Sequence, residues 1–146
     1  MCSSFLGELM TATHNFTTST GNTFKAALYL ASATVNASTT AYSSSNEVTG
    51  TNYVAGGVTV TNGTSPLSSN TSTTAGVGYW TPSASITYTN VTLTTAFDAV
   101  LIYNSSASNK AVSVHTFGSQ TVTAGTFTLT MPSNTTSTAL LRLATT

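Results

Sequence analysis

The spacing of apolar residues along the chain changes from a helical period to a strand period near Phe24. In the first ten residues, four large apolar side chains share one helical face: Phe5, Leu6, Leu9 and Met10. This spacing predicts a short helix over Ser3–Met10, for which Ser3 or Ser4 can act as the N-cap. The polar stretch that follows indicates a connector that ends near Asn22.

Beyond this connector, apolar and polar residues alternate with the period of two that is typical of β-strands. In the first such segment, Phe24, Ala26 and Leu28 share one face, and Lys25 and Tyr29 share the other. The same alternation predicts further strands at residues 58–61, 78–80, 85–89, 91–94, 98–103, 111–117, 126–131 and 139–143.

Turn-forming pairs separate many of these segments, among them Asn62-Gly63, Gly118-Ser119 and Ala124-Gly125. Because no helix-length segment lies between the strands, the pattern favours an all-β fold, an antiparallel β-sandwich of the jelly-roll type with a short N-terminal helix. We expect residues 1–22 to form the helix and its connector, and residues 23–146 to form one β-sandwich domain. Residues 32–57 and 63–76 are the least regular stretches and are expected to be long loops.

The chain carries very little charge for its length. Three Lys or Arg and three Asp or Glu give a net charge of zero in 146 residues, whereas 40% of the residues are hydrophobic. Binding of nucleic acid or of an anionic membrane requires a basic cluster, so we expect neither partner, and we expect neither a leader nor a membrane span. Since nothing repels a second copy, near-zero charge favours a homo-oligomer.

Catalytic and metal sites need several ionisable side chains at one point, and this chain has few. His14, His115 and Asp98 could join a serine in a hydrolytic triad, but no Gly-x-Ser-x-Gly elbow occurs. Alternation around His115 points Val112 and Val114 inward and leaves Ser113 and His115 on the opposite, outer face. We therefore predict no catalytic residue, no metal site and no cofactor, and a protein that is not an enzyme.

Two segments are candidates for contact with other proteins. The apolar stripe of the N-terminal helix is too short to fold alone, so we expect an assembly element rather than part of the core. In the 32–57 loop, aromatic anchors accompany one of the few acids; the alternative is that this loop packs on its own domain. The candidate interface residues are Phe5, Leu6, Leu9, Met10, Tyr42, Glu47 and Tyr53.

Several blocks of the sequence occur together in a recognisable order. They lie at residues 2–5 with 8–9, 14–16, 22–29, 39–42, 46–58 and 99–104. The most specific is Glu-Val-x-Gly-x-x-Tyr-x-x-Gly-Gly at residues 47–57. In order and spacing, over nearly the whole chain, these blocks resemble a family of small proteins encoded among the virion structural genes of tailed bacteriophages. The chain departs from the family pattern where many members carry acidic residues, near residue 95 and after Phe117.

The resemblance implies a virion component with a β-sandwich body. We expect first a capsid cement or decoration protein that is made in the host cytoplasm and binds the major capsid protein on the outer surface of the head, as a homotrimer. A minor tail or head–tail protein comes next, and a host-recognition module that binds glycans is the remaining alternative. A nearly uncharged β-domain suits a cement protein, because shape complementarity and neutral hydrogen bonds depend little on salt.

Overall fold

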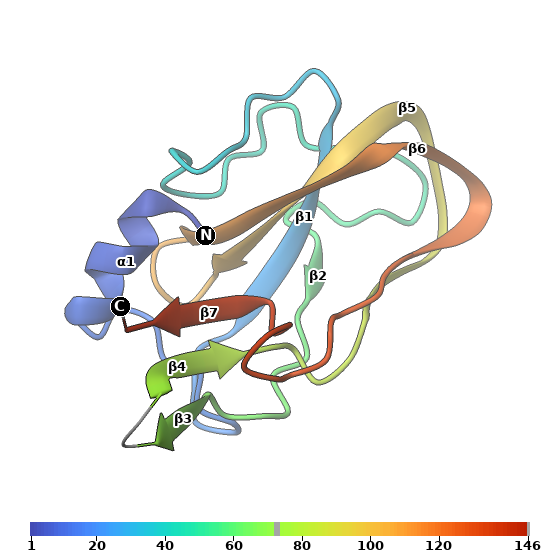
Figure 1. Cartoon of the computed structure of the whole chain (residues 1–146). Coiled ribbons are helices and arrows are strands. Elements are labelled where there is room, and N and C mark those ends of the chain that lie inside the picture. Colours follow the sequence, from blue (N-terminus) through green and yellow to red (C-terminus); the bar gives the residue numbers. More distant parts are fainter. Residues whose placement is uncertain (72–73, 146) are drawn as a thin grey trace.

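The computed structural model describes residues 1–71 and 74–145. Its elements, shown in Figure 1, are α1 (Ser3–Met10), β1 (Phe24–Leu30), β2 (Val58–Thr59), β3 (Leu67–Thr71), β4 (Thr74–Trp80), β5 (Ile86–Asn104), β6 (Lys110–Leu129) and β7 (Leu141–Ala144). The strands form two antiparallel sheets, with the orders β2-β1-β5-β6 and β3-β4-β7. The prediction of a mostly β, antiparallel fold with one short N-terminal helix is therefore confirmed.

Helix α1 has the predicted bounds, but its N-cap differs from the prediction. The N-cap is Cys2, and no side chain caps the helix. Instead, the N–H groups of Cys2 and Ser3 donate to the carbonyls of Val112 (2.9 Å) and Ala37 (2.7 Å). The start of the helix is thus fixed by backbone contacts with segments distant in sequence, which local spacing does not reveal.

Strands β5 and β6 form one long hairpin that the sequence divided into shorter segments. Shifts in register occur along the hairpin, and Asn90 and Ala124 adopt positive φ values of 53° and 46° within it. Such β-bulges bend a strand without ending it. The pairs Gly118-Ser119 and Ala124-Gly125, which resemble turns, therefore lie inside β6.

The small sheet corrects one predicted loop. Strand β3 and the start of β4 lie within residues 63–76, and β3 pairs with β4 from Leu67 opposite Tyr79. The β3 sequence, Leu-Ser-Ser-Asn-Thr, has one apolar residue and no alternation, so its period gave no signal. Backbone pairing with β4 defines this edge strand.

The jelly-roll part of the predicted fold is not confirmed. A jelly roll has eight strands arranged in two Greek keys. The described ranges contain seven strands, and the hairpins β3–β4 and β5–β6 each stay within one sheet.

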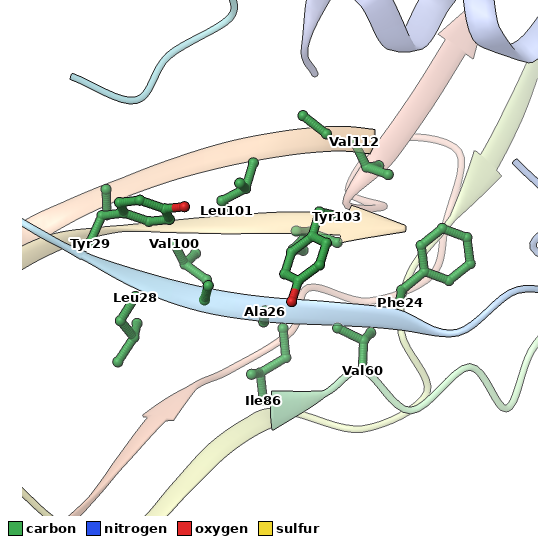
Figure 2. Close-up of a cluster of buried hydrophobic side chains, with 14 of the residues drawn as sticks. Phe24, Ala26, Leu28, Tyr29, Val60, Ile86, Val100, Leu101, Tyr103 and Val112 are labelled. Carbon is green, nitrogen blue, oxygen red and sulfur yellow. The ribbon is translucent and has the colours of Figure 1, made fainter. Parts of the chain in front are cut away.

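Strand β1 is buried on both of its faces. Figure 2 shows Leu28 and Ile86 on one side of this strand and Tyr29 and Leu101 on the other. The side of Leu28 faces residues of the β5–β6 hairpin and the small sheet. The loop before β2 covers the side of Tyr29. In this loop the ring of Tyr42 stacks on that of Tyr103, with centroids 4.7 Å apart. The run Ala-Ala-Leu-Tyr in β1 is consistent with a strand covered on two sides.

The N-terminal segment is part of the core, which corrects the expectation that it stands apart. Cys2 and Phe5 are 0% and 2% exposed and belong to the same hydrophobic cluster as the sheet residues. In the connector, Phe16 stacks on Phe24 with ring centroids 4.3 Å apart. Residues 1–22 therefore supply side chains that the core needs.

Candidate functional site

The most specific sequence block, residues 47–57, folds around a buried carboxylate. Glu47 is 6% exposed, and three donors point at its two oxygens. The Tyr42 hydroxyl donates to Oε2 (2.6 Å), and the Tyr53 hydroxyl and the Gly56 N–H donate to Oε1 (2.7 and 2.8 Å). These charge-assisted hydrogen bonds compensate for the burial of the charge. We call these four residues the Glu47 network.

The Glu47 network helps to close the edge of β1 that the two-residue strand β2 leaves open. The Tyr53 hydroxyl accepts the N–H of Leu28 (3.0 Å), and the N–H of Val48 donates to the Leu28 carbonyl (3.0 Å). Two residues before Leu28 in β1, the carbonyl of Ala26 accepts a hydrogen bond from the Tyr88 hydroxyl (2.8 Å). Side-chain hydroxyls and loop backbone thus take the place of a neighbouring strand.

The glycines of this block are also explained by the packing. Gly57 has a φ of +72°, and a Cβ there would lie 1.7 Å from the Ala26 carbonyl oxygen. Gly56 has a φ of +87°, and a Cβ on Gly50 would lie 2.0 Å from the Thr92 carbonyl oxygen. Only glycine fits such contacts and the two positive φ values. The block therefore encodes the fold of its own loop.

Burial, and after it the charge of Glu47, raise the pKa of the tyrosines near this carboxylate. The affected residues are Tyr42, Tyr53, Tyr88 and Tyr103. For Tyr103 the pKa rises to about 12. Their hydroxyls remain protonated at neutral pH, as they must because each of the four donates a hydrogen bond.

The structure gives the three predicted contact residues of the 32–57 loop an internal role. The carboxylate of Glu47 is buried, and the hydroxyls of Tyr42 and Tyr53 both point at it. This arrangement agrees with the alternative in which the loop packs on its own domain. Direct contact of these residues with a partner stays a prediction, and their polar atoms are already engaged.

The four candidate contact residues of α1 are divided between the core and the surface. Phe5 is buried and Leu9 is partly buried against the core. Leu6 and Met10 are 47% and 86% exposed. The helix therefore has an inner apolar side that anchors it and an outer apolar side that is open to a partner.

An ion cluster ties α1 to the turn between β5 and β6. Glu8 accepts from the Lys110 ammonium (2.7 Å) and from His14 Nε2 (2.8 Å). The Asn104 amide lies 3.1 Å from His14 Nδ1, and its Oδ1 accepts the Ser106 N–H (3.0 Å), so Nδ2 faces His14 as a donor. Burial opposes the charge of Glu8, but the hydrogen bonds from Lys110 and His14 lower its pKa.

His115 and Ser113 form a pair that sequence alternation placed on an outer face. His115 Nε2 lies 3.0 Å from Ser113 Oγ, but Ser113 is 0% exposed. Ile86 and Leu140 line a cavity beside His115. Burial lowers the pKa of His115. The outer placement of Ser113 was therefore wrong, because strand alternation does not show that a second layer covers this face.

Residues 1–71 and 74–145 contain no group of three or more His, Cys, Asp or Glu that could hold a metal ion. In the same part of the chain, no helix has the length and the hydropathy needed to cross a bilayer. The lack of a metal, of a cofactor and of an activity stays a prediction.

Helix α1 lies near the point where β7 ends (Figure 1). A groove with an almost entirely apolar lining lies between this helix and the small sheet. Its volume is about 140 Å³. The lining includes Phe5 and Leu9 from α1, and Leu67, Trp80, Leu141 and Leu143 from β3, β4 and β7. We call this feature the apolar groove.

A second cavity is polar and holds about 350 Å³. Hydroxyl and amide side chains contribute much of its lining, among them Thr81, Ser83, Ser85 and Asn134. Within the part of the chain that the structure describes, the buried Oδ1 atom of Asn134 has no hydrogen-bond partner. The hydroxyl and amide side chains of such a lining can bind a hydroxyl group of a small ligand or a water molecule.

No protein-family model matches the chain, and searches of curated proteins and of solved structures find no match either.

Proposed function

We propose that the protein is a structural component of a tailed-bacteriophage virion, a cement or decoration protein that binds the outer surface of the head as a homotrimer. The observation that carries the proposal is the block at residues 47–57, the most specific part of the resemblance. Glu47, Tyr53, Gly56 and Gly57 all act in one packed loop. Since the block defines a local fold, its occurrence here is better support for a shared architecture than similar composition.

The proposal includes a β-sandwich body. Buried residues from both sheets belong to one hydrophobic cluster, with Trp80 and Leu141 from the small sheet and Phe24 and Ile86 from the larger sheet and its hairpin. Two sheets that share a core in this way are typical of a sandwich.

The surface suits attachment to a preformed shell. The exposed positions of the outer part of β6 are mostly uncharged residues such as Thr121, Thr123, Thr126 and Thr128, which offer neutral hydrogen bonds. The apolar groove adds a nonpolar contact area elsewhere on the molecule. A cement protein repeats such contacts at many equivalent positions, so weak and salt-independent interactions are sufficient.

Quantitative cryo-electron microscopy of virions tests the proposal. We expect copies on the outside of the head at many symmetry-related positions. Particles that lack the protein should assemble but release their DNA at a lower temperature than complete particles. A few copies at the tail or at the head–tail joint would contradict the cement role and favour a minor tail or head–tail protein.

One observation favours a second candidate, the host-recognition module. The polar cavity, lined by Asn134 and several hydroxyl side chains, has a lining of the kind that binds sugar hydroxyl groups. A glycan array with the wild type and the Asn134→Ala variant tests it, with Thr87→Ala on the exposed side of β5 as the control. Two results together would establish this candidate. Asn134→Ala alone should abolish glycan binding, and phage that lacks the protein should have heads as robust as the wild type but fail to adsorb to cells.

A further inference from the structure

We propose that the apolar groove binds a second copy of this chain, with the outer side of α1 from one copy seated against the groove of the next. This inference deepens the homo-oligomer part of the proposed function. It names the surface of self-association and holds whether or not the oligomer binds a phage head.

The first argument is the concentration of exposed apolar side chains around the groove. Among the described side chains, the exposed large hydrophobic residues are Met1, Leu6, Met10, Val54, Leu67 and Leu143. Three of them line the groove, and two more lie on the helix that forms its wall. Only Val54 lies elsewhere. Apolar residues that gather in this way, on a chain whose surface is otherwise rich in hydroxyl groups, mark an interaction surface.

The lack of charge in the lining of the groove distinguishes between possible occupants. No charged side chain lines the groove. Glu8, on α1, is held by Lys110 and His14, and Arg142 lies between two lining leucines, so strand alternation points it to the opposite face of β7. A second copy therefore brings an equally uncharged surface and leaves no charge buried without a partner. A membrane or a nucleic acid would need basic residues here.

The side chains that project from α1 match the groove in size. Met10 is 86% exposed on the helix beside the groove, and Leu6 is 47% exposed on the same element. A cavity of about 150 Å³ is known to hold a molecule of the size of benzene, so a groove of about 140 Å³ accepts one methionine or leucine side chain. A projecting side chain and a groove on one continuous surface allow each copy to give and to receive the same contact, as closed oligomers require.

Sedimentation velocity of the purified full chain tests this inference. We expect a discrete oligomer at micromolar concentration, and a dissociation constant at least about tenfold higher in Met10→Ser and Leu143→Ser. A third variant, Gly78→Val, fills the groove from β4: a Cβ there meets only the Leu143 carbonyl oxygen at 3.9 Å, so the domain can accommodate it. Val54→Ser is the matched control and should assemble as the wild type does.

Disulfide trapping gives a second measurement that does not depend on the loss of assembly. Met10→Cys and Leu143→Cys proteins, mixed and oxidised, should cross-link to each other faster than Val54→Cys protein cross-links to either. The native thiol of Cys2 is fully buried and contributes little background. Thermal melting shows whether each variant is folded.

A wild type that is monomeric at about 100 μM, or an oligomer that Gly78→Val leaves unchanged, would overturn the inference. So would an oligomer in which Val54→Ser and Met10→Ser weaken assembly equally. If the oligomer forms through the groove but virions carry no copies on the head, the inference stands and the cement function fails. If virions carry the protein as separate monomers, the inference fails and attachment to the head stands.

Discussion

The hydroxyl group of Tyr53 donates to the carboxylate of Glu47 across 2.7 Å, inside a loop that the sequence offers as a contact surface. The same hydroxyl accepts the N–H of Leu28 in β1, so the acid acts on the sheet through the tyrosine. One of the three acidic residues of the chain is thus used to hold a long loop against the strand that needs a neighbour.

Glu47→Gln should destabilise the protein by about 2–4 kcal/mol, because an amide supplies one acceptor oxygen where the carboxylate supplies two charged ones to three donors. Urea denaturation at neutral pH measures the change. Asp98→Asn is the matched control: this side chain is only partly buried and makes no hydrogen bond within the described ranges, so the change should be below about 0.5 kcal/mol. Equal effects of the two substitutions would contradict the role of the Glu47 network.

Gly57→Ala should be more damaging than Gly118→Ala. At Gly57, the added Cβ would lie 1.7 Å from a backbone oxygen of β1 and the residue keeps a positive φ, so we expect a loss of about 3 kcal/mol or more. At Gly118, nothing lies within 4 Å of the added Cβ, and the change should be within about 0.5 kcal/mol. Thermal unfolding of the two variants decides the matter, and similar melting temperatures would refute the prediction.

Stability should fall steeply at alkaline pH. The pKa of Tyr53 and of its three tyrosine neighbours is raised above the ordinary value of 10.0 by burial and by Glu47. A raised pKa means that the unfolded chain loses these protons first, so the stabilisation is complete below about pH 10 and is lost as the pH rises further. Denaturation from about pH 8 to 11 should show this fall, with a shallower slope in Tyr53→Phe. A flat profile up to about pH 11 would be inconsistent with this mechanism.

The parts of the fold that depend on local period could be predicted, and those that depend on distant partners could not. Alternation found β1, and helical spacing gave both ends of α1. Alternation divided the β5–β6 hairpin into shorter segments, because the sequences of its bulges resemble turns. Alternation also missed β3, whose sequence has no apolar–polar pattern. The Glu47 network follows from no spacing rule, although the sequence offers the acid and both tyrosines as candidate contact residues. Their direction, inward rather than outward, is set by the open edge of β1.

The two apolar sides of α1 should respond differently to substitution. Phe5→Ala should cost about 3–5 kcal/mol, because this side chain is 2% exposed and its removal leaves a cavity in the core. Leu6→Ala, one position along and 47% exposed, should change the stability of the monomer by less than about 0.5 kcal/mol. Chemical denaturation of the two variants compares them directly. If Phe5→Ala unfolds with the wild-type midpoint, the helix is not part of the core.

Acid should weaken the attachment of α1. The pKa of Glu8 is lowered from 4.5 against the effect of burial, because Lys110 and His14 donate to the carboxylate. A lowered pKa gives stabilisation that is present above about pH 4.5 and is lost as the pH falls through the pKa of the folded state. Stability should therefore fall less between about pH 6 and 3 in Glu8→Gln than in the wild type. An identical fall in both proteins would show that Glu8 contributes nothing to the acid response.

Cys2 is positioned to report when the N-terminal segment opens. Its thiol is fully buried, burial raises its pKa, and its N–H is bound to the Val112 carbonyl of β6. A thiol reagent can reach the sulfur only after the N-terminal segment separates from β6. The labelling rate in native buffer therefore measures a local opening, whereas calorimetry measures the unfolding of the whole domain. In a virion, the labelling rate of the same single thiol would measure how often the N-terminus of a bound copy opens.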